Sequence, residues 1–133
     1  MTTLRFKTVR RTQFLDITSE VERVVRDAGV QNGVCYVYVP HTTAGVAVNE
    51  HADPDVARDV EGIFDRLILH RGPYRHAEGN TDSHMKAILT GTAQTVLVAG
   101  GKLTLGTWQG IFLCEFDGPR ERTVTVKVVP DPK

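Results

Sequence analysis

The stretch VCYVYVPHTTAGVAV, residues 34 to 48, holds two apolar segments separated by a short polar insert. The first segment is a run of β-branched and aromatic residues, which favour strands, and it ends at Pro40, which has no backbone N–H to donate. The second segment, Gly45–Val48, is a further strand candidate. The insert His41-Thr42-Thr43 is therefore expected between two strands.

Helix signals lie on both sides of this stretch. Asp53 followed by Pro54 is typical of a helix start, and the spacing of Ser19 and Glu22 fits a capping box for a helix over about residues 20–28. A short helix is also expected over His84–Leu89. The apolar residues at helical spacing after Pro54 predict the buried side of that helix: Val56, Val60, Ile63, Phe64 and Leu67.

Further strand patterns cover residues 4–9, 95–98, 103–105, 110–116 and 122–129, and the polar stretch 70–83 lacks any periodicity, as in a long loop. Strands dominate, and several are joined by short turns. The predicted fold class is therefore α+β, mainly antiparallel and sandwich-like sheets with two or three short helices.

The composition limits the kinds of partner. The 133 residues suit a single domain spanning 1–133, and 16 acidic residues balance 16 basic ones, which predicts no nucleic-acid footprint. No apolar run is long enough to span a bilayer, and the N-terminus does not resemble a signal peptide, so we expect a cytoplasmic protein without a membrane partner. Cys35 and Cys114 lie far apart in apolar segments, which predicts buried, reduced thiols.

Five short motifs rich in polar residues lie between His41 and Arg120. They are H-T-T-A-G from His41, N-E-x-x-D-P-D from Asn49, E-G-N-x-D-x-H-x-K from Glu78, L-G-T-W-Q from Leu105 and E-F-D-G-P-R from Glu115. In this order and at these spacings they resemble the YjbQ family, also called the secondary thiamine-phosphate synthase family. The resemblance implies a sandwich-like α+β fold, a homotrimer with sites near its subunit boundaries, and a weak thiamine-phosphate synthase activity.

The candidate site residues come from these motifs, apart from His76, which lies just before the third motif. The resemblance favours a shared divalent metal site, Zn²⁺ or Mg²⁺, with His41, His76 and His84 as ligands, although each histidine alone reads as an ordinary loop residue. The candidates for catalysis are His84, Asp82, Asn80, Lys86 and Glu115. The candidates for substrate binding are Thr42, Thr43, Gly45, Asn49, Glu50, Trp108, Gln109 and Arg120.

Several of these residues also have a structural interpretation. Asp82 could cap the following helix, residues 42–45 and 117–120 could form ordinary turns, and Trp108 could be a core residue or a subunit contact. His51 and His70 match no motif and are interpreted as surface residues.

Three functions are compatible with this pattern. The first is a transferase of the thiamine-phosphate synthase type, which joins hydroxymethylpyrimidine diphosphate to thiazole phosphate and releases pyrophosphate. The second is a zinc-dependent hydrolase that uses a histidine-bound water. The third is a non-catalytic trimer that binds a small phosphorylated molecule.

Overall fold

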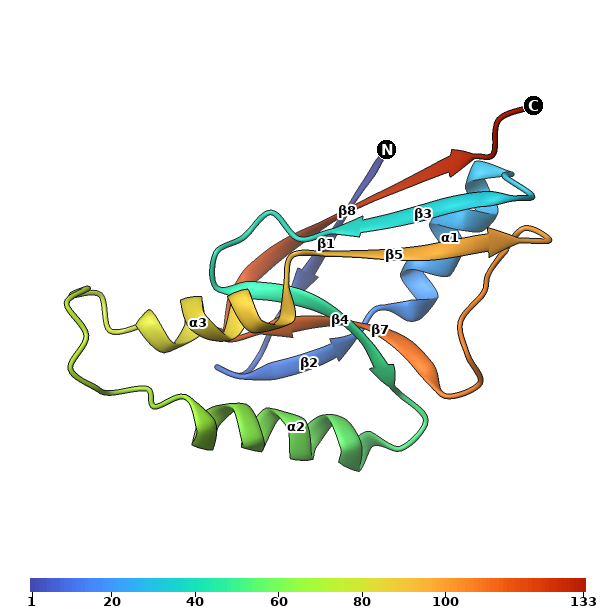
Figure 1. Cartoon of the computed structure of the whole chain (residues 1–133). Helices are drawn as coiled ribbons and strands as arrows, with labels where there is room; N and C mark the ends of the chain where they lie inside the picture. The colour runs from blue at the N-terminus through green and yellow to red at the C-terminus, as the bar shows by residue number, and fades with distance from the viewer.

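The computed structural model describes all 133 residues, which form eight strands and three helices (Figure 1). The strands are β1 (Thr2–Lys7), β2 (Gln13–Asp16), β3 (Gly33–Tyr38), β4 (Ala44–Glu50), β5 (Ala93–Ala99), β6 (Lys102–Leu103), β7 (Gln109–Glu115) and β8 (Glu121–Pro130). The helices are α1 (Thr18–Ala28), α2 (Pro54–Leu67) and α3 (Thr81–Thr90).

The strands form two antiparallel sheets. The larger sheet has the order β1-β8-β3-β5-β6, and the smaller has the order β2-β7-β4. Every recorded strand pair is antiparallel. The predicted α+β class with antiparallel sheets is confirmed, and the one strand that the sequence pattern did not reveal is β2, which has only four residues.

The main core lies between the two sheets. Alternate residues of the strands face inward, as the period of two requires, and Val21 and Val25 of α1 add to the core at one end, together with Ile17 just before the helix. Cys35 belongs to this core and Cys114 to a smaller one, and both thiols are free and buried, as predicted.

The smaller core lies on the other face of the three-stranded sheet, where α2 and α3 cover it (Figure 1). Phe14, Phe64 and Phe116 pack here with ring centres 5.3 to 6.0 Å apart. This core positions α3 beside the end of β7, and that placement brings two of the sequence motifs together.

The predicted buried side of α2 is wrong in part. Ile63 is 50% exposed and Leu67 is 71% exposed, whereas the buried residue of the helix is Glu61. The Glu61 carboxylate accepts two hydrogen bonds from Arg10, at 2.8 and 3.2 Å, and one from the backbone N–H of Phe14. Because these bonds attach α2 to β2, the helix turns Glu61 inward and leaves two large apolar side chains outside.

The helix starts test the capping predictions. Asp53 caps α2 as predicted, since its side chain accepts a hydrogen bond from the N–H of Asp55 at 2.9 Å. The capping box predicted for α1 does not form: the helix begins at Thr18, whose N–H donates to Asp16 at 3.0 Å. The third helix is longer than predicted, so Asp82 lies inside it and does not cap it.

The outer face of the five-stranded sheet is left uncovered by any helix. Tyr36 and Tyr38 of β3 and Leu97 of β5 are exposed there, and Met85, Ile88 and Leu89 are exposed on α3. None of the three helices has the length and apolar character needed to cross a membrane.

Candidate functional site

The motif residues gather at the two ends of β7. Glu115 ends this seven-residue strand and Gln109 begins it, so the two ends are about 20 Å apart. Thr43, Asn80 and Asp117 lie at the Glu115 end. The structure therefore divides the predicted site residues into two separate groups within one chain.

At the first end, Glu115 and Arg122 form a buried ion pair. Arg122 Nε donates to Glu115 Oε1 at 2.9 Å, and Arg122 Nη2 donates to Thr43 Oγ1 at 2.8 Å. The Thr8 hydroxyl donates to Glu115 Oε1 at 2.7 Å. Burial alone would raise the pKa of Glu115, but the hydrogen bonds from Arg122 and Thr8 outweigh it and hold the pKa below its ordinary value.

The role predicted for Glu115 changes accordingly. Its side chain is fully buried and its oxygens are occupied by neighbouring donors, so it joins the ends of β7 and β8 and does not face a substrate. Arg122, its partner, was not among the predicted site residues, because the alternation of β8 placed it in a strand with one wet face and gave no sign of a buried charge.

A second buried network surrounds Lys86. Its ammonium group donates to Asp65 at 2.9 Å and to Asp82 at 3.1 Å, and its side chain is only 1% exposed. Arg11 binds the Asp82 carboxylate through two nitrogens, at 2.9 and 3.0 Å. Burial opposes the charge on Asp82, yet the hydrogen bonds from Arg11 and Lys86 lower its pKa.

These charges balance one another. A cavity of about 300 Å³ is lined by Arg10, Arg11, Thr12, Asp65, His70 and Lys86. Each of its strong cations already has a carboxylate partner: Arg10 has Glu61, Arg11 has Asp82 and Lys86 has Asp65. This cavity consequently offers no unpaired positive charge to a phosphate, and a small phosphorylated ligand stays a prediction.

Asn80 connects the third motif to the fifth. Its Nδ2 donates to Asp117 Oδ2 at 2.8 Å, and the same oxygen accepts from Arg120 Nη2 at 2.9 Å. The Ser83 hydroxyl also donates to the carbonyl of Phe116. Arg120 thus binds within its own turn, and Asn80 Oδ1 is the one buried side-chain oxygen left without a hydrogen-bond partner.

The H-T-T-A-G motif packs strand ends together. His41 Nε2 accepts from the Thr123 N–H at 3.0 Å, while burial and the nearby Arg122 charge lower the pKa of His41. Gly45 has no space for a side chain, because a Cβ would lie 2.1 Å from Thr90 Oγ1, and Thr42 is exposed without a recorded hydrogen bond. Gly45 therefore allows β4 to pack closely against the end of α3.

The second group lies at the opposite end of β7. The register pairs Glu50 with Gln109 and Asn49 with Gly110. Gln109 Oε1 accepts from the Gly106 N–H at 2.8 Å and so stabilises its own turn. Trp108 is 63% exposed, which rules out the core position considered for it.

His51 belongs to the same end. Its Nδ1 lies 2.8 Å from Asp16 Oδ2, and a Cβ on Gly110 would collide with its ring. Sequence reasoning placed His51 on the surface. The only available signal for its contact with β2 was Gly110, whose missing side chain leaves room for the imidazole.

The predicted cluster of three histidines does not form within one chain. His76 and His84 lie side by side, with ring centres 5.5 Å apart and ring planes at 86°. His41 is bound instead to β8, and no three His, Cys, Asp or Glu side chains are grouped to hold a metal ion. His41, His76 and His84 come from separate parts of the chain, and the fold brings only His76 and His84 together.

The His76–His84 pair is accessible and lightly bonded. His84 is half-buried, and its ring makes no recorded hydrogen bond within the chain. His76 is exposed, with Nδ1 3.3 Å from Thr81 Oγ1 and Nε2 3.7 Å from a carboxylate oxygen of Glu78. Both imidazoles can therefore turn toward a ligand from solvent.

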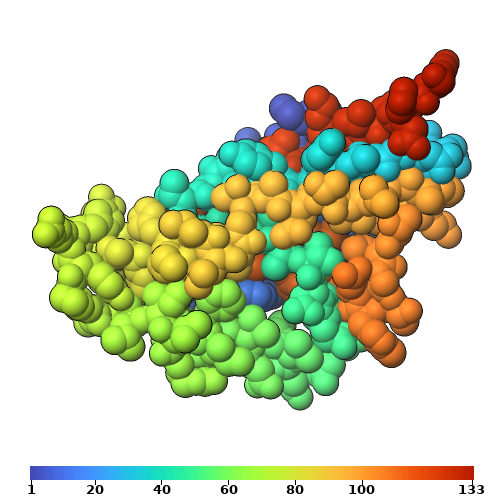
Figure 2. Space-filling model, in the orientation of Figure 1, coloured from blue at the N-terminus to red at the C-terminus, as the bar shows by residue number.

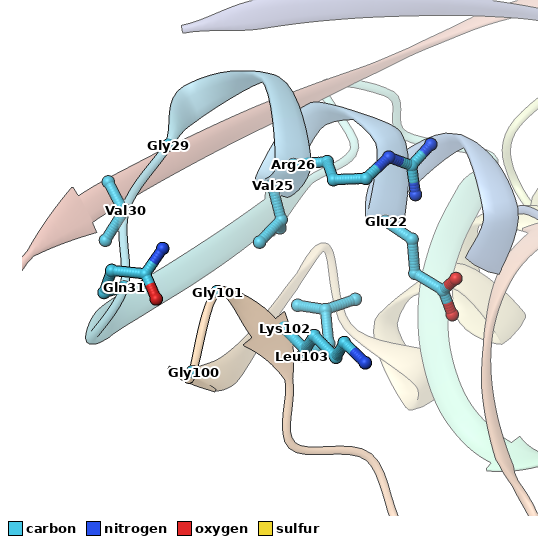
Figure 3. Close-up of a pocket in the computed structure, with 10 residues that line it drawn as sticks. All are labelled: Glu22, Val25, Arg26, Gly29, Val30, Gln31, Gly100, Gly101, Lys102 and Leu103. Atoms are coloured by element: carbon cyan, nitrogen blue, oxygen red, sulfur yellow. The ribbon is translucent and has the colours of Figure 1, made fainter.

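A further cavity of about 500 Å³ lies between the end of α1 and the turn that joins β5 to β6 (Figure 3). Arg26 and Lys102 line it together with Glu22, and Gly29, Gly100 and Gly101 form part of its wall. Its charged side chains are all exposed, and none of the predicted site residues reaches it.

The fold and the site define a small α+β protein with an uncovered outer sheet and a pair of adjacent histidines. The chain belongs to the family described as UPF0047 protein YjbQ-like, whose pattern it matches over residues 2–131. The Bacillus subtilis UPF0047 protein YugU is 48% identical over 128 residues, which cover 96% of this chain and 97% of that protein. This confirms the resemblance identified from the five motifs.

The similarity to solved structures also places the chain in this family. An uncharacterised YjbQ/UPF0047 family protein from Clostridium acetobutylicum is 47% identical, with a TM-score of 0.95, and the match covers 97% of this chain and all of that chain. A YbjQ-like protein of unknown function from Sulfolobus solfataricus is 34% identical, with a TM-score of 0.94, covering 98% and 96% of the two chains.

These names correct the function predicted from the sequence. The relatives are named only as UPF0047 proteins or as proteins of unknown function, and none of these names states a thiamine-phosphate synthase activity. The predicted transferase is therefore wrong, and the same names give no support to the zinc-dependent hydrolase. The family membership establishes the fold but carries no reaction with it.

Proposed function

We propose that this chain binds a divalent metal ion and that His76 and His84 are two of its ligands. The observation that carries the proposal is the pair of imidazole rings 5.5 Å apart, one of which has no hydrogen-bond partner in the chain. Buried or structural histidines are usually fixed by hydrogen bonds, whereas a ring that is free at both nitrogens is available to an ion.

The separation of the rings fits zinc coordination. A zinc–nitrogen bond of about 2.1 Å places the centre of each imidazole about 3.2 Å from the ion. Two such rings at a tetrahedral angle have centres about 5.2 Å apart, close to the observed distance between His76 and His84. Nitrogen ligands favour Zn²⁺ over Mg²⁺, which prefers oxygen.

Two imidazoles do not complete a zinc site, so we propose that a second copy of the chain supplies a further ligand. Ile88 follows His84 by one helical turn and lies on the same side of α3, where it is exposed. An apolar contact through Ile88 would bring the surface of a second copy next to His84. The family resemblance implies a homotrimer with sites near its subunit boundaries, and we propose that this assembly supplies the further ligand.

Isothermal titration with Zn²⁺ tests the metal site. We expect His76→Ala and His84→Ala each to weaken binding at least about tenfold, because each removes one of the two ligands. His51→Ala is the matched control, since His51 lies at the opposite end of β7 and contacts Asp16. Unchanged binding in His84→Ala would contradict the proposal.

Light scattering tests the second copy. We expect Ile88→Lys to lower the mass of the particle in solution and to weaken Zn²⁺ binding in parallel, because the added charge opposes burial of this side chain. Arg5→Glu on β1, which is exposed and lies on a different element, is a control for surface charge. Full zinc affinity in a monomeric Ile88→Lys protein would show that one chain is sufficient.

A further inference from the structure

An apolar cavity of about 180 Å³ lies between α2, β4 and the end of α3. Figure 2 shows the molecule hollowed at this place, with blue atoms of the N-terminal part of the chain visible at the bottom. Phe14 and Phe112 line the cavity from β2 and β7, and Val56, Val60 and Phe64 line it from α2. Eight of its eleven lining residues are hydrophobic, so it favours an apolar group.

Small side chains leave this cavity between α2 and the sheet. Glu61 attaches the helix to β2 through Arg10 and the backbone of Phe14, and Asp65 attaches it to Lys86 of α3. Ala47 and Ala57 are too small to fill the space that remains between β4 and the helix. The gap therefore follows from side-chain sizes and from the way in which the helix is attached.

One charged residue lines the cavity. Glu50 is the only ionisable residue among those that line it, and Asn49 and Thr90 are the only other polar ones. The Ala52 N–H donates to one Glu50 carboxylate oxygen at 3.0 Å, and no hydrogen bond is recorded at the other. A carboxylate beside an apolar cavity is complementary to a ligand with an apolar body and a cationic end.

We infer that this cavity binds a small primary amine carrying a single ring or a short branched chain. The volume decides the size of the apolar part, because a cavity of about 150 Å³ lined by apolar side chains accommodates a benzene ring. The negative charge of Glu50 favours a ligand whose polar end is a cation. This site shares no residue with the His76–His84 pair and does not depend on the proposed metal.

Three probes with the same phenyl ring test the inference on the full chain: benzylamine, benzyl alcohol and benzoate. Methyl NMR signals of Val48, Val56 and Val60 report on the cavity directly. Benzylamine should bind about fivefold more tightly than benzyl alcohol, because an exposed carboxylate adds a modest attraction. Benzoate should bind most weakly, since Glu50 repels it.

Two variants separate the apolar part from the charge. Glu50→Gln keeps the shape of the side chain and should reduce the affinity for benzylamine to that for benzyl alcohol. Ala47→Leu should fill the cavity and abolish the binding of both, with folding checked by circular dichroism. Should Ala47→Leu fail to fold, the Glu50→Gln comparison still tests the charge preference.

Several results would overturn the inference. Equal affinity for all three probes would remove the cationic preference, and unchanged binding in Ala47→Leu would place the probes elsewhere. An absence of methyl shifts in the wild-type chain at millimolar benzylamine would show that the cavity does not accept the ligand. Binding that occurs only after an oligomer is diluted to monomers would mean that a second copy fills the cavity instead.

Discussion

Replacing Arg122 by methionine should destabilise the protein more than a substitution of an exposed residue does. The change leaves Glu115 as a buried charge without its partner. Both side chains of this pair are almost completely buried. After the change, Glu115 keeps only the Thr8 hydroxyl and the N–H groups of Phe116 and Asp117. Removing one partner of a buried ion pair typically costs about 3–5 kcal/mol of folding free energy.

This cost converts into a large shift of the melting temperature. An unfolding entropy of about 2.1 cal/mol/K per residue gives about 0.28 kcal/mol/K for a chain of 133 residues. A loss of about 3–5 kcal/mol then lowers the melting temperature by about 11–18 °C. Differential scanning calorimetry of the wild type and Arg122→Met at pH 7 measures this decrease of the melting temperature.

A double variant tests the physical reason. In Glu115→Gln with Arg122→Met no unpaired charge remains, so the double variant should be more stable than Arg122→Met alone. If the two single changes simply add, the destabilisation does not come from an unpaired carboxylate and the reasoning is wrong. The pH dependence gives a second test of the same pair.

The sign of that dependence follows from the lowered pKa of Glu115. A carboxylate with a folded pKa below its unfolded value of about 4.5 stabilises the protein above that pH, and the stabilisation is lost as the pH falls through the folded pKa. In Arg122→Met this contribution is absent, and protonation relieves the buried charge. The difference in stability between the wild type and Arg122→Met should therefore shrink as the pH falls. It begins to shrink where Glu115 of the variant takes up a proton, and it shrinks further below about pH 4.5 as the wild type loses its own contribution.

Three other predictions concern single groups. Burial raises the pKa of the Cys35 thiol to about 11 and that of Cys114 further still, so a thiol reagent at pH 8 should label neither until denaturant is added, and rapid labelling of the native chain would contradict their burial. Asp53→Ala should cost about 1 kcal/mol, measured by urea titration, because it removes the cap of α2; no change would mean that Pro54 alone sets the helix start. The lowered pKa of His41 means that the unfolded chain binds the proton more readily, so stability should begin to fall below about pH 6.5, and His41→Gln should lose this component.

Much of the fold could be predicted from local patterns. The run from Val34 to Val39 is β3 almost to the residue, and Asp53-Pro54 marks the start of α2. These signals work because strand propensity, proline and helix caps act over a few neighbouring residues. The short β2 could not be found in this way, since its pairing with β7 depends on a partner about one hundred residues away.

The candidate site was less predictable, because its geometry depends on contacts distant in sequence. Asn80 meets the fifth motif through Asp117, whereas Asp82 and Lys86 bind each other within the third motif. Their charges, however, are neutralised by Arg11 and Asp65, which no motif identified. The separation of His41 from the other two histidines likewise follows from the strand order, which a single sequence does not specify.

The exposure of large apolar residues was the feature of the structure that the sequence predicted least well. Ile63 and Leu67 fit the helical pattern for the buried side of α2, yet both face solvent. Periodicity identifies an apolar side of a helix but does not say whether the same chain or another one covers it. The identity of the covering surface has to come from the assembled protein in solution.

Diffraction at the zinc edge from crystals grown with Zn²⁺ would test the proposed metal site most directly. We predict an anomalous peak between the rings of His76 and His84, with at least one further ligand from a second copy of the chain. A peak bound by other side chains, or none at the pair while both rings stay ordered, would contradict the proposed function.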